Sequence, residues 1–245
     1  MKKIIKIIFL FVMMLVTLPV NAKGFGVGKN AKGIRPNVND PIITNNNGYA
    51  IGPDDNRVYL TFDCGYENGY TAKILDTLKE HNIKACFFIT GHYLNSSPEL
   101  VRRMINEGHL VGNHTYSHKD FTKSTNEEII NDITKLEKKY EEITNEKMAK
   151  IVRPPRGEYD EKSQKLLASN GYKSIFWSLA FVDWNKDTYN GNHYSYNKVM
   201  SRIHPGAIIL LHSVSKDNQE DLSDIIEGVI NEGYVFSSIN ELWYN

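Results

Sequence analysis

The segment VYLTFDC (residues 58–64), followed by TAKILDTLKEHN (residues 71–82), decides the fold class of this 245-residue chain. The first part is a continuous apolar run rich in aromatic and branched residues, which is typical of a strand buried on both faces. The second part has the apolar spacing of an amphipathic helix. A buried strand followed by such a helix is the repeating unit of parallel α/β folds.

The same alternation continues to the end of the chain. Further strand-like runs are ACFFIT (85–90), LVGNH (110–114), IVRPP (151–155), SIFWSLA (174–180), AIILLHS (207–213) and VFSSI (235–239). Helical stretches are expected at 97–108, 126–144, 160–171, 196–203 and 222–233. Gly108, Gly171 and Gly233 end three of these stretches, as C-cap glycines do. About seven such units favour a single distorted (β/α) barrel over an open doubly wound sheet, which is the alternative.

The first 22 residues have the composition of a secretory signal peptide. Lysines precede an apolar run from Ile7 to Val20, and Asn21 and Ala22 follow as the expected cleavage region. The run is shorter than the roughly 20 residues that a membrane-spanning helix needs, and a retained N-terminal anchor is the alternative. Both interpretations place the rest of the chain outside the cytoplasmic membrane, with membrane contact only if the segment is retained.

Residues 23–56 are rich in Gly, Asn and Pro and show no helical period, so we expect an irregular N-terminal arm before one domain at 57–245. Without the first 22 residues, which hold three lysines and no acids, 26 basic residues stand against 29 acidic ones. This nearly neutral balance gives no electrostatic reason to expect nucleic acid as a partner. No stable protein partner is expected either.

Polar residues cluster where the expected strands end. They are Asp63, Cys64, His114, His118, Arg153, Arg156, Asp183 and His212. In a barrel, the C-terminal ends of the strands meet on one face, where active sites are built. Each residue alone has a structural explanation, such as helix capping by Asp63 or a core position for His212. Their occurrence at five strand ends predicts an active site.

The segment NHTYSH (residues 113–118) is the strongest local signal. Its imidazoles, His114 and His118, are four residues apart and could bind one divalent ion, although two solvent-facing histidines are the alternative. Asp63 or Cys64 could supply a third ligand and leave a position open for water.

Five segments, in order, resemble the motifs of the polysaccharide deacetylases of carbohydrate esterase family 4, the NodB-homology domain. They are TFDCGYENGYT (61–71), GNHTYSH (112–118), RPPRGEY (153–159), FWSLAFVDW (176–184) and HPGAIILLHSVSKDN (204–218). The resemblance covers residues 57–245. Within the family, the chain is most similar to the N-acetylmuramic acid deacetylases of spore formers, whose product leads to muramic δ-lactam in cortex peptidoglycan.

The resemblance implies a NodB-like barrel that hydrolyses an acetamide with the help of a metal. Asp63 would be the general base that takes a proton from water. His114 and His118 would hold a divalent metal, with zinc expected among the divalent ions. His212 would protonate the departing sugar amine, and Asp183 would orient its imidazole.

The resemblance also assigns supporting roles. Arg153 would keep Asp63 ionised, and the backbone N–H of Arg156 would help to stabilise the oxyanion. Leu210 and Trp184 would form the wall of the acetyl-methyl pocket.

The Arg156 side chain is in addition our candidate for binding the lactyl carboxylate of muramic acid. The alternative is a surface ion pair of Arg156 with Glu158 or Asp160.

The chain departs from the family pattern at Cys64, where most members have an aspartate that binds the metal. Cys64 could bind the metal as a thiolate, could be a bystander beside a metal held by two histidines, or could form a disulfide with Cys86. We favour the bystander, and then the ligand.

The resemblance implies a secreted enzyme that acts on the peptidoglycan glycan strand, in the cell wall or the spore cortex. Two alternatives from other classes stay open. One is deacetylation of N-acetylglucosamine or chitin-like units by the same scaffold. The other is a catalytically inactive glycan-binding relative, which the substituted third ligand would explain.

Overall fold

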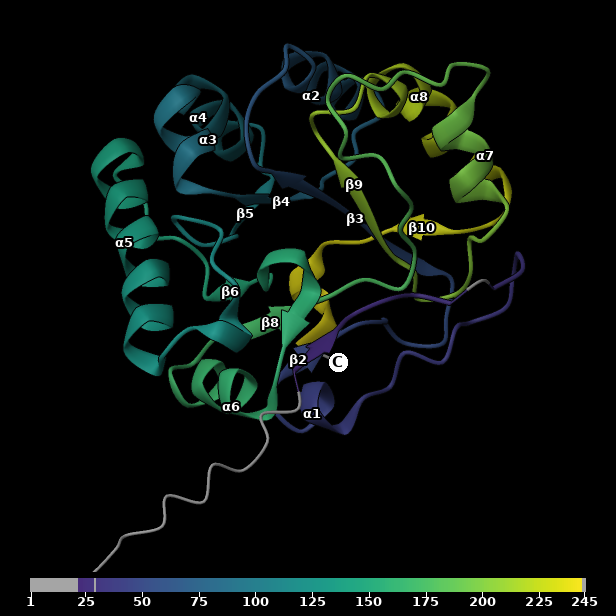
Figure 1. Cartoon of the computed structure of the whole chain (residues 1–245). Coiled ribbons are helices and arrows are strands. Elements are labelled where there is room, and N and C mark those ends of the chain that lie inside the picture. The colour runs from purple at the N-terminus through teal and green to yellow at the C-terminus, as the bar shows by residue number, and fades with distance from the viewer. Residues whose placement is uncertain (1–21, 29, 244–245) are drawn as a thin grey trace, which may run out of the picture.

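The computed structural model describes residues 22–28 and 30–243, and its centre is a curled sheet of parallel strands (Figure 1). The strands of this sheet are β2 (Gly48–Tyr49), β3 (Arg57–Cys64), β4 (Cys86–Ile89), β5 (Leu110–Asn113), β6 (Ile151–Val152), β8 (Lys173–Ile175), β9 (Ile208–His212) and β10 (Val235–Phe236). The helices are α1 (Pro41–Thr44), α2 (Thr71–Glu80), α3 (Gly91–Ser96), α4 (Pro98–Asn106), α5 (Asn126–Thr144), α6 (Glu161–Ser169), α7 (Tyr194–Met200) and α8 (Lys216–Asn231).

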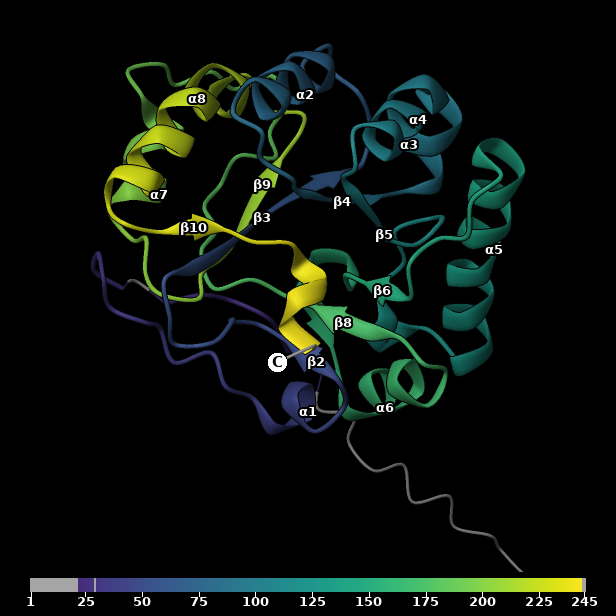
Figure 2. The ribbon, with the colours of Figure 1, turned by 180° about the vertical axis from the view of Figure 1, so that it is seen from behind.

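The strand order is β10-β3-β4-β5-β6-β8-β2. Strand β9 lies off this path and pairs with residues 59–63 of β3, which follow the two residues of β3 that pair with β10. Beyond β8, a parallel bridge between Leu179 and Ile209 joins the far side of the sheet to β9. The helices cover the outside of this curl, as the two opposite views show (Figures 1 and 2). The single distorted (β/α) barrel expected from the sequence is therefore confirmed.

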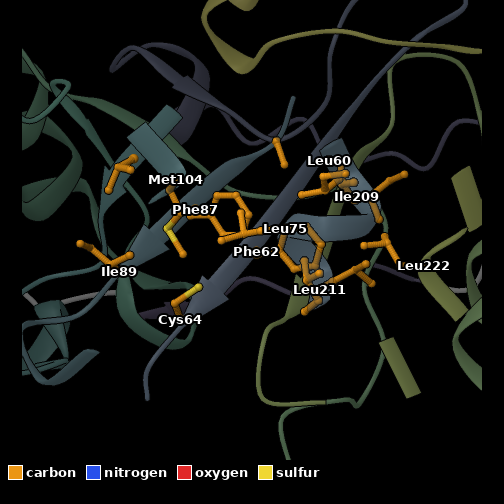
Figure 3. Packing of buried hydrophobic residues seen from close by; sticks show 14 of the residues in the cluster. Leu60, Phe62, Cys64, Leu75, Phe87, Ile89, Met104, Ile209, Leu211 and Leu222 are labelled. Atoms are coloured by element: carbon orange, nitrogen blue, oxygen red, sulfur yellow. The ribbon is translucent and has the colours of Figure 1, made fainter. Parts of the chain in front are cut away.

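Side chains of β3 alternate between the two faces of the sheet, as they must in a strand. Leu60, Phe62 and Cys64 belong to the apolar cluster between the sheet and the outer helices (Figure 3). Tyr59 belongs to a second cluster inside the barrel. Asp63 lies two positions after Thr61 on this inner side, so the alternation aims its carboxylate into the barrel.

The glycines expected to end three helices do so. Gly108, Gly171 and Gly233 follow the C-caps of α4, α6 and α8 with φ angles of 79°, 79° and 84°. Positive φ costs glycine little, which explains its use here.

Two expected boundaries differ. Helix α8 begins at Lys216 rather than near residue 222, because the Ser215 side chain caps it by accepting from the Asn218 N–H at 3.2 Å. The run 174–180 is regular only to Ile175, after which the chain makes the single bridge at Leu179.

Most of the described part of the arm at 23–56 has no regular secondary structure, but three short elements lie within it. β1 (Lys23–Gly24) pairs antiparallel with β7 (Glu158–Tyr159), and β2 pairs in parallel with β8. Ile43 of α1 is fully buried in the inner cluster. The period of a two-residue strand and a one-turn helix is too short to recognise in a sequence. The arm is thus part of the folded unit.

Three short 3₁₀ segments complete the fold, at Phe121–Lys123, Pro155–Gly157 and Ile239–Trp243. Within the part of the chain that the structure describes, no helix is long and apolar enough to cross a membrane. The expected signal peptide, apart from Ala22, lies outside the described residues.

Candidate active site

Asp63 and His212 lie opposite each other on adjacent parallel strands. The register of β3 and β9 pairs these two residues directly at the C-terminal ends of both strands. The register therefore brings two groups that are 149 positions apart in the sequence to the same face of the barrel, where the carboxylate and the imidazole can act on one substrate.

Arg153, just after β6, holds Asp63 in place. One guanidinium nitrogen donates to Asp63 Oδ1 at 2.7 Å, the other donates to Thr61 Oγ1 at 2.9 Å, and Nε donates to the Ile175 carbonyl at 3.1 Å. The guanidinium is fully buried and lies 4.2 Å from the centre of the Phe88 ring. Such a network fixes both the position and the charge of the carboxylate.

Burial alone would raise the pKa of Asp63, but the Arg153 guanidinium, with the nearby histidines, holds this pKa below its ordinary value. Asp63 is thus ionised at neutral pH and can accept a proton.

His114 presents one nitrogen to the site. Its Nδ1–H donates to the Arg153 carbonyl at 2.9 Å, which leaves Nε2 as the nitrogen with a free lone pair, 3.5 Å from Asp63 Oδ2. Burial lowers the pKa of His114 and keeps the imidazole neutral, as a metal ligand must be. The His118 ring lies edge-on to it, with ring centres 4.8 Å apart.

The turn that carries both histidines has unusual backbone angles. Thr115 and His118 have φ angles of 66° and 55°, and a β-branched residue rarely adopts such a value. Asn113 Oδ1 accepts from the Thr115 N–H at 2.8 Å, and Asp132 of α5 accepts from the Ser117 N–H at 3.0 Å.

The same turn approaches α3 closely. A Cβ on Gly91 would lie 2.6 Å from the Tyr116 carbonyl oxygen, so only glycine fits there. The surrounding contacts therefore impose the strained turn.

His212 and Asp183 form the second half of the site. His212 Nδ1–H donates to Asp183 Oδ1 at 2.7 Å, and the His212 backbone N–H donates to Asp183 Oδ2 at 2.9 Å. Burial alone would lower the pKa of His212, but the Asp183 carboxylate raises it above its ordinary value. His212 therefore favours the charged form that can donate a proton.

Three more of the expected residues lie around these groups. Trp184 is 53% exposed, with its ring centre 5.7 Å from that of His212, whereas Leu210 is buried two positions before His212. The Arg156 side chain is 51% exposed and donates to Glu158 Oε2 at 2.8 Å and lies 3.2 Å from Asp120 Oδ2. Burial lowers the pKa of His118 to about 4, and the neighbouring His114 and, more weakly, the Arg156 guanidinium act in the same direction.

Cys64 lies outside this arrangement. Its side chain is fully buried in the outer apolar cluster, on the other side of β3 from Asp63, and burial raises the pKa of its thiol. Thiolate ligation is therefore disfavoured.

The disulfide with Cys86 is absent, since both cysteines are free. The register places Cys86 opposite Thr61, three residues from Cys64, which is about 10 Å along a strand. A disulfide needs Cα atoms about 4.4–6.8 Å apart. The bystander interpretation fits this placement.

Sequence reasoning missed two residues that support the site. Asp132 lies in a helix and Asn218 in the first turn of another, where polar residues are ordinary. Only the contacts in the folded chain, of Asp132 with Ser117 and of Asn218 with Asp183, reveal what these residues do.

A barrel with a buried, ionised carboxylate, a carboxylate-paired imidazole and a histidine pair at one end fits the class of hydrolases that deacetylate polysaccharides. Residues 50–175 match the polysaccharide deacetylase family, and the chain belongs to this family of hydrolases. The chain is 43% identical to the peptidoglycan-N-acetylmuramic acid deacetylase PdaA of Bacillus subtilis over 80% of this chain and 74% of that one.

The solved structure of that relative, described as a family 4 carbohydrate esterase, superposes with a TM-score of 0.88 over 93% of this chain and 99% of that one, at 38% identity. A peptidoglycan-N-acetylglucosamine deacetylase of Bacillus cereus is 37% identical over 74% of this chain and 66% of that one. A family pseudoenzyme from Bacillus anthracis is 28% identical with a TM-score of 0.73, over 80% of this chain and 68% of that one.

Proposed function

We propose that this chain is a secreted, metal-assisted deacetylase that removes the acetyl group from N-acetylmuramic acid residues of peptidoglycan. The observation that carries the proposal is the pairing in register of Asp63 with His212, each with its own partner of opposite charge. A base kept ionised and an acid kept protonated within one site are what amide hydrolysis needs.

Asp63 would begin the reaction. Its carboxylate takes a proton from a water molecule whose oxygen attacks the acetyl carbonyl carbon. The negative charge then forms on the carbonyl oxygen, where the backbone N–H of Arg156 would donate a hydrogen bond. Arg153, which donates to Asp63 at 2.7 Å, would keep the carboxylate ionised until it takes this proton.

His212 would complete the reaction. Its imidazolium gives a proton to the sugar nitrogen as the C–N bond breaks, so that acetate and a free amine leave. Asp183 holds the ring by its Nδ1–H, which leaves Nε2 to face the substrate. Trp184 and Leu210 would form an apolar wall for the acetyl methyl group.

His114 and His118 would hold the metal, which we propose to be zinc. The chemistry that a bound divalent ion supplies is polarisation of the acetyl carbonyl and a lower pKa for water. The free Nε2 and the neutral form of His114 fit this role. Among the described residues, no group of three or more His, Cys, Asp and Glu side chains is arranged to hold a metal. A zinc ion held by His114 and His118 alone would have its other positions open to water.

Two observations support the preference for muramic acid. One is the 43% identity to the peptidoglycan-N-acetylmuramic acid deacetylase PdaA of Bacillus subtilis, and the other is the presence of Arg156. Muramic acid bears a lactyl group that ends in a carboxylate when no peptide is attached, and a guanidinium suits such a group. In the structure, the Arg156 guanidinium forms ion pairs with Glu158 and Asp120, so the lactyl carboxylate would have to compete with these two side chains. The product would lead to muramic δ-lactam in the spore cortex.

Mass spectrometry of peptidoglycan fragments after incubation with residues 23–245 tests the proposal directly. We expect loss of one acetyl group from muramic acid residues. Loss from N-acetylglucosamine instead would favour the second candidate, which the 37% identical Bacillus cereus relative supports. No release of acetate from either sugar would favour a glycan-binding protein, as the family pseudoenzyme suggests.

A further inference from the structure

Asn218 is fully buried in the first turn of α8, directly behind the Asp183–His212 pair. Its Nδ2 donates to Asp183 Oδ2 at 2.6 Å and to the His212 carbonyl at 3.0 Å. One amide group thus contacts both members of the pair, the carboxylate and the backbone of the histidine.

The orientation of this amide is fixed from its other side. Ser195 Oγ of α7 donates to Asn218 Oδ1 at 2.6 Å, and the Ser195 N–H donates to Asp221 Oδ2 at 2.8 Å. A reversed amide would set its oxygen against the Asp183 carboxylate and the His212 carbonyl, with no hydrogen between them. The hydrogen bonds therefore allow only one orientation.

We infer that Asn218 is a positioning residue for the proposed acid, His212. Asp183 Oδ2 accepts from the His212 backbone and from Asn218, while Oδ1 accepts from the imidazole. Asn218 thereby clamps the carboxylate relative to the strand end that carries the imidazole. This inference rests on the proposed function for its effect on catalysis, and on geometry alone for its effect on the imidazole.

The test compares two substitutions of Asn218 in the full mature chain. Asn218→Ala removes both donated hydrogen bonds, and we expect kcat for acetate release to fall about 10- to 100-fold, as when partners that orient functional side chains are removed. KM should change little, because the residue does not reach the substrate. Asn231→Ala, at the exposed end of the same helix, is the matched control.

Asn218→Asp supplies a readout that a purely structural role would not change. The ionisable groups around the position are Asp183, His212, Asp217 and Asp221, with His193 beside Asp221. The introduced carboxyl would be ionised at high pH and repel Asp183, whereas once protonated at lower pH it can donate as the amide does. We expect Asn218→Asp to recover activity as the pH falls and Asn218→Ala not to recover. Asn231→Asp is the control.

NMR of the imidazole separates this inference from the proposed function. The Nδ1 proton of His212, held by Asp183, should give a slowly exchanging resonance in the parent and in both Asn231 variants, and should broaden at neutral pH in both Asn218 variants. If the parent releases no acetate, the proposed function fails while this measurement still stands. An unchanged resonance, or equal losses with the same pH profile in both Asn218 variants, would overturn the inference.

Discussion

Asp63 and His212 have pKa values shifted in opposite directions by partners of opposite charge. The guanidinium of Arg153 lowers the pKa of Asp63 against the effect of burial, and Asp183 raises that of His212 against the same effect. Between the two pKa values, the carboxylate is ionised and the imidazole is protonated, which are the forms that the proposed base and acid need.

Substitution of these two residues should collapse turnover. We expect Asp63→Asn and His212→Gln each to lower kcat by about 10²–10⁴-fold, because each group acts in the transition state. In the parent, activity should fall on the acidic side as Asp63 gains its proton and on the alkaline side as His212 loses one. Each variant should lose one of these limbs in a pH–rate profile. If either variant kept a kcat within a few-fold of the parent, the role proposed for the substituted residue would be wrong.

The histidine pair makes a separate prediction about the metal. The double variant with His114→Ala and His118→Ala should lose bound zinc, measured by equilibrium dialysis, and acetate release together. His92→Ala, an exposed imidazole in α3, should keep both. Tight zinc binding by the double variant would show that the metal lies elsewhere.

Under the proposed function, Arg156 is the residue that distinguishes the two sugars. Arg156→Tyr should lower deacetylation of peptide-free muramic acid units roughly ten- to a hundred-fold, the equivalent of a charge-assisted hydrogen bond of about 1.5–3 kcal/mol. Its effect on N-acetylglucosamine oligomers should be smaller, and Arg102→Tyr on α4 should affect neither sugar. Equal losses on both sugars would assign Arg156 to the shared chemistry or to its ion pairs with Glu158 and Asp120.

At the scale of elements, helix α5 holds the turn that carries His114 and His118, the proposed metal ligands. The Asp132 carboxylate accepts from both the N–H and the hydroxyl of Ser117, at 3.0 Å and 2.6 Å, in the segment between the two histidines. The helix itself begins with a capping box of Thr125 and Glu128, about one to two turns before Asp132.

Substitution of Asp132 and substitution of Thr125 should change different properties, the zinc affinity and the stability of the fold. Asp132→Ala should weaken zinc binding about 10- to 100-fold, because the turn loses the partner that orients it. Thr125→Ala should lower the free energy of unfolding by about 1 kcal/mol through loss of the cap, with zinc affinity unchanged. Calorimetric titration and urea unfolding measure the two quantities. Equal zinc affinity in the parent and in Asp132→Ala would contradict this role for α5.

At the scale of the whole molecule, the sequence predicts most of what depends on local period. The long helix at 126–144 and the buried strand around Leu60 are visible because their apolar spacing is sustained. The residues at strand ends are predictable because parallel strands of a barrel end on one face.

What the sequence does not predict depends on contacts between distant segments. The side of β3 on which Cys64 lies, the partner of Asn218 and the place of β2 beside β8 follow only from register and packing. The two-residue strands have no period of their own to read.

We predict that the N-terminal arm unfolds together with the barrel, and substitution of one buried isoleucine tests this. Ile43 is fully buried among residues of the inner cluster, whereas Ile34 of the same arm is 61% exposed. Arg35 ties the arm to the barrel, donating to the Pro205 carbonyl at 2.8 Å. If the arm and the barrel unfold together, Ile43→Ala should cost about 2–5 kcal/mol of global stability, as other large-to-small core substitutions do.

Ile34→Ala should change that stability little, because an exposed side chain leaves no cavity when it is shortened. Urea unfolding can be followed by tryptophan fluorescence in a background where Trp184 and Trp243 are replaced by Phe. The remaining Trp177 packs against Phe25 of the arm with ring centres 5.4 Å apart, so its signal reports on both parts at once. A separate early transition in Ile43→Ala, with the main midpoint unmoved, would show that the arm detaches independently. A single transition at lower urea with an unchanged m-value would show one folded unit, because the slope follows the surface exposed on unfolding.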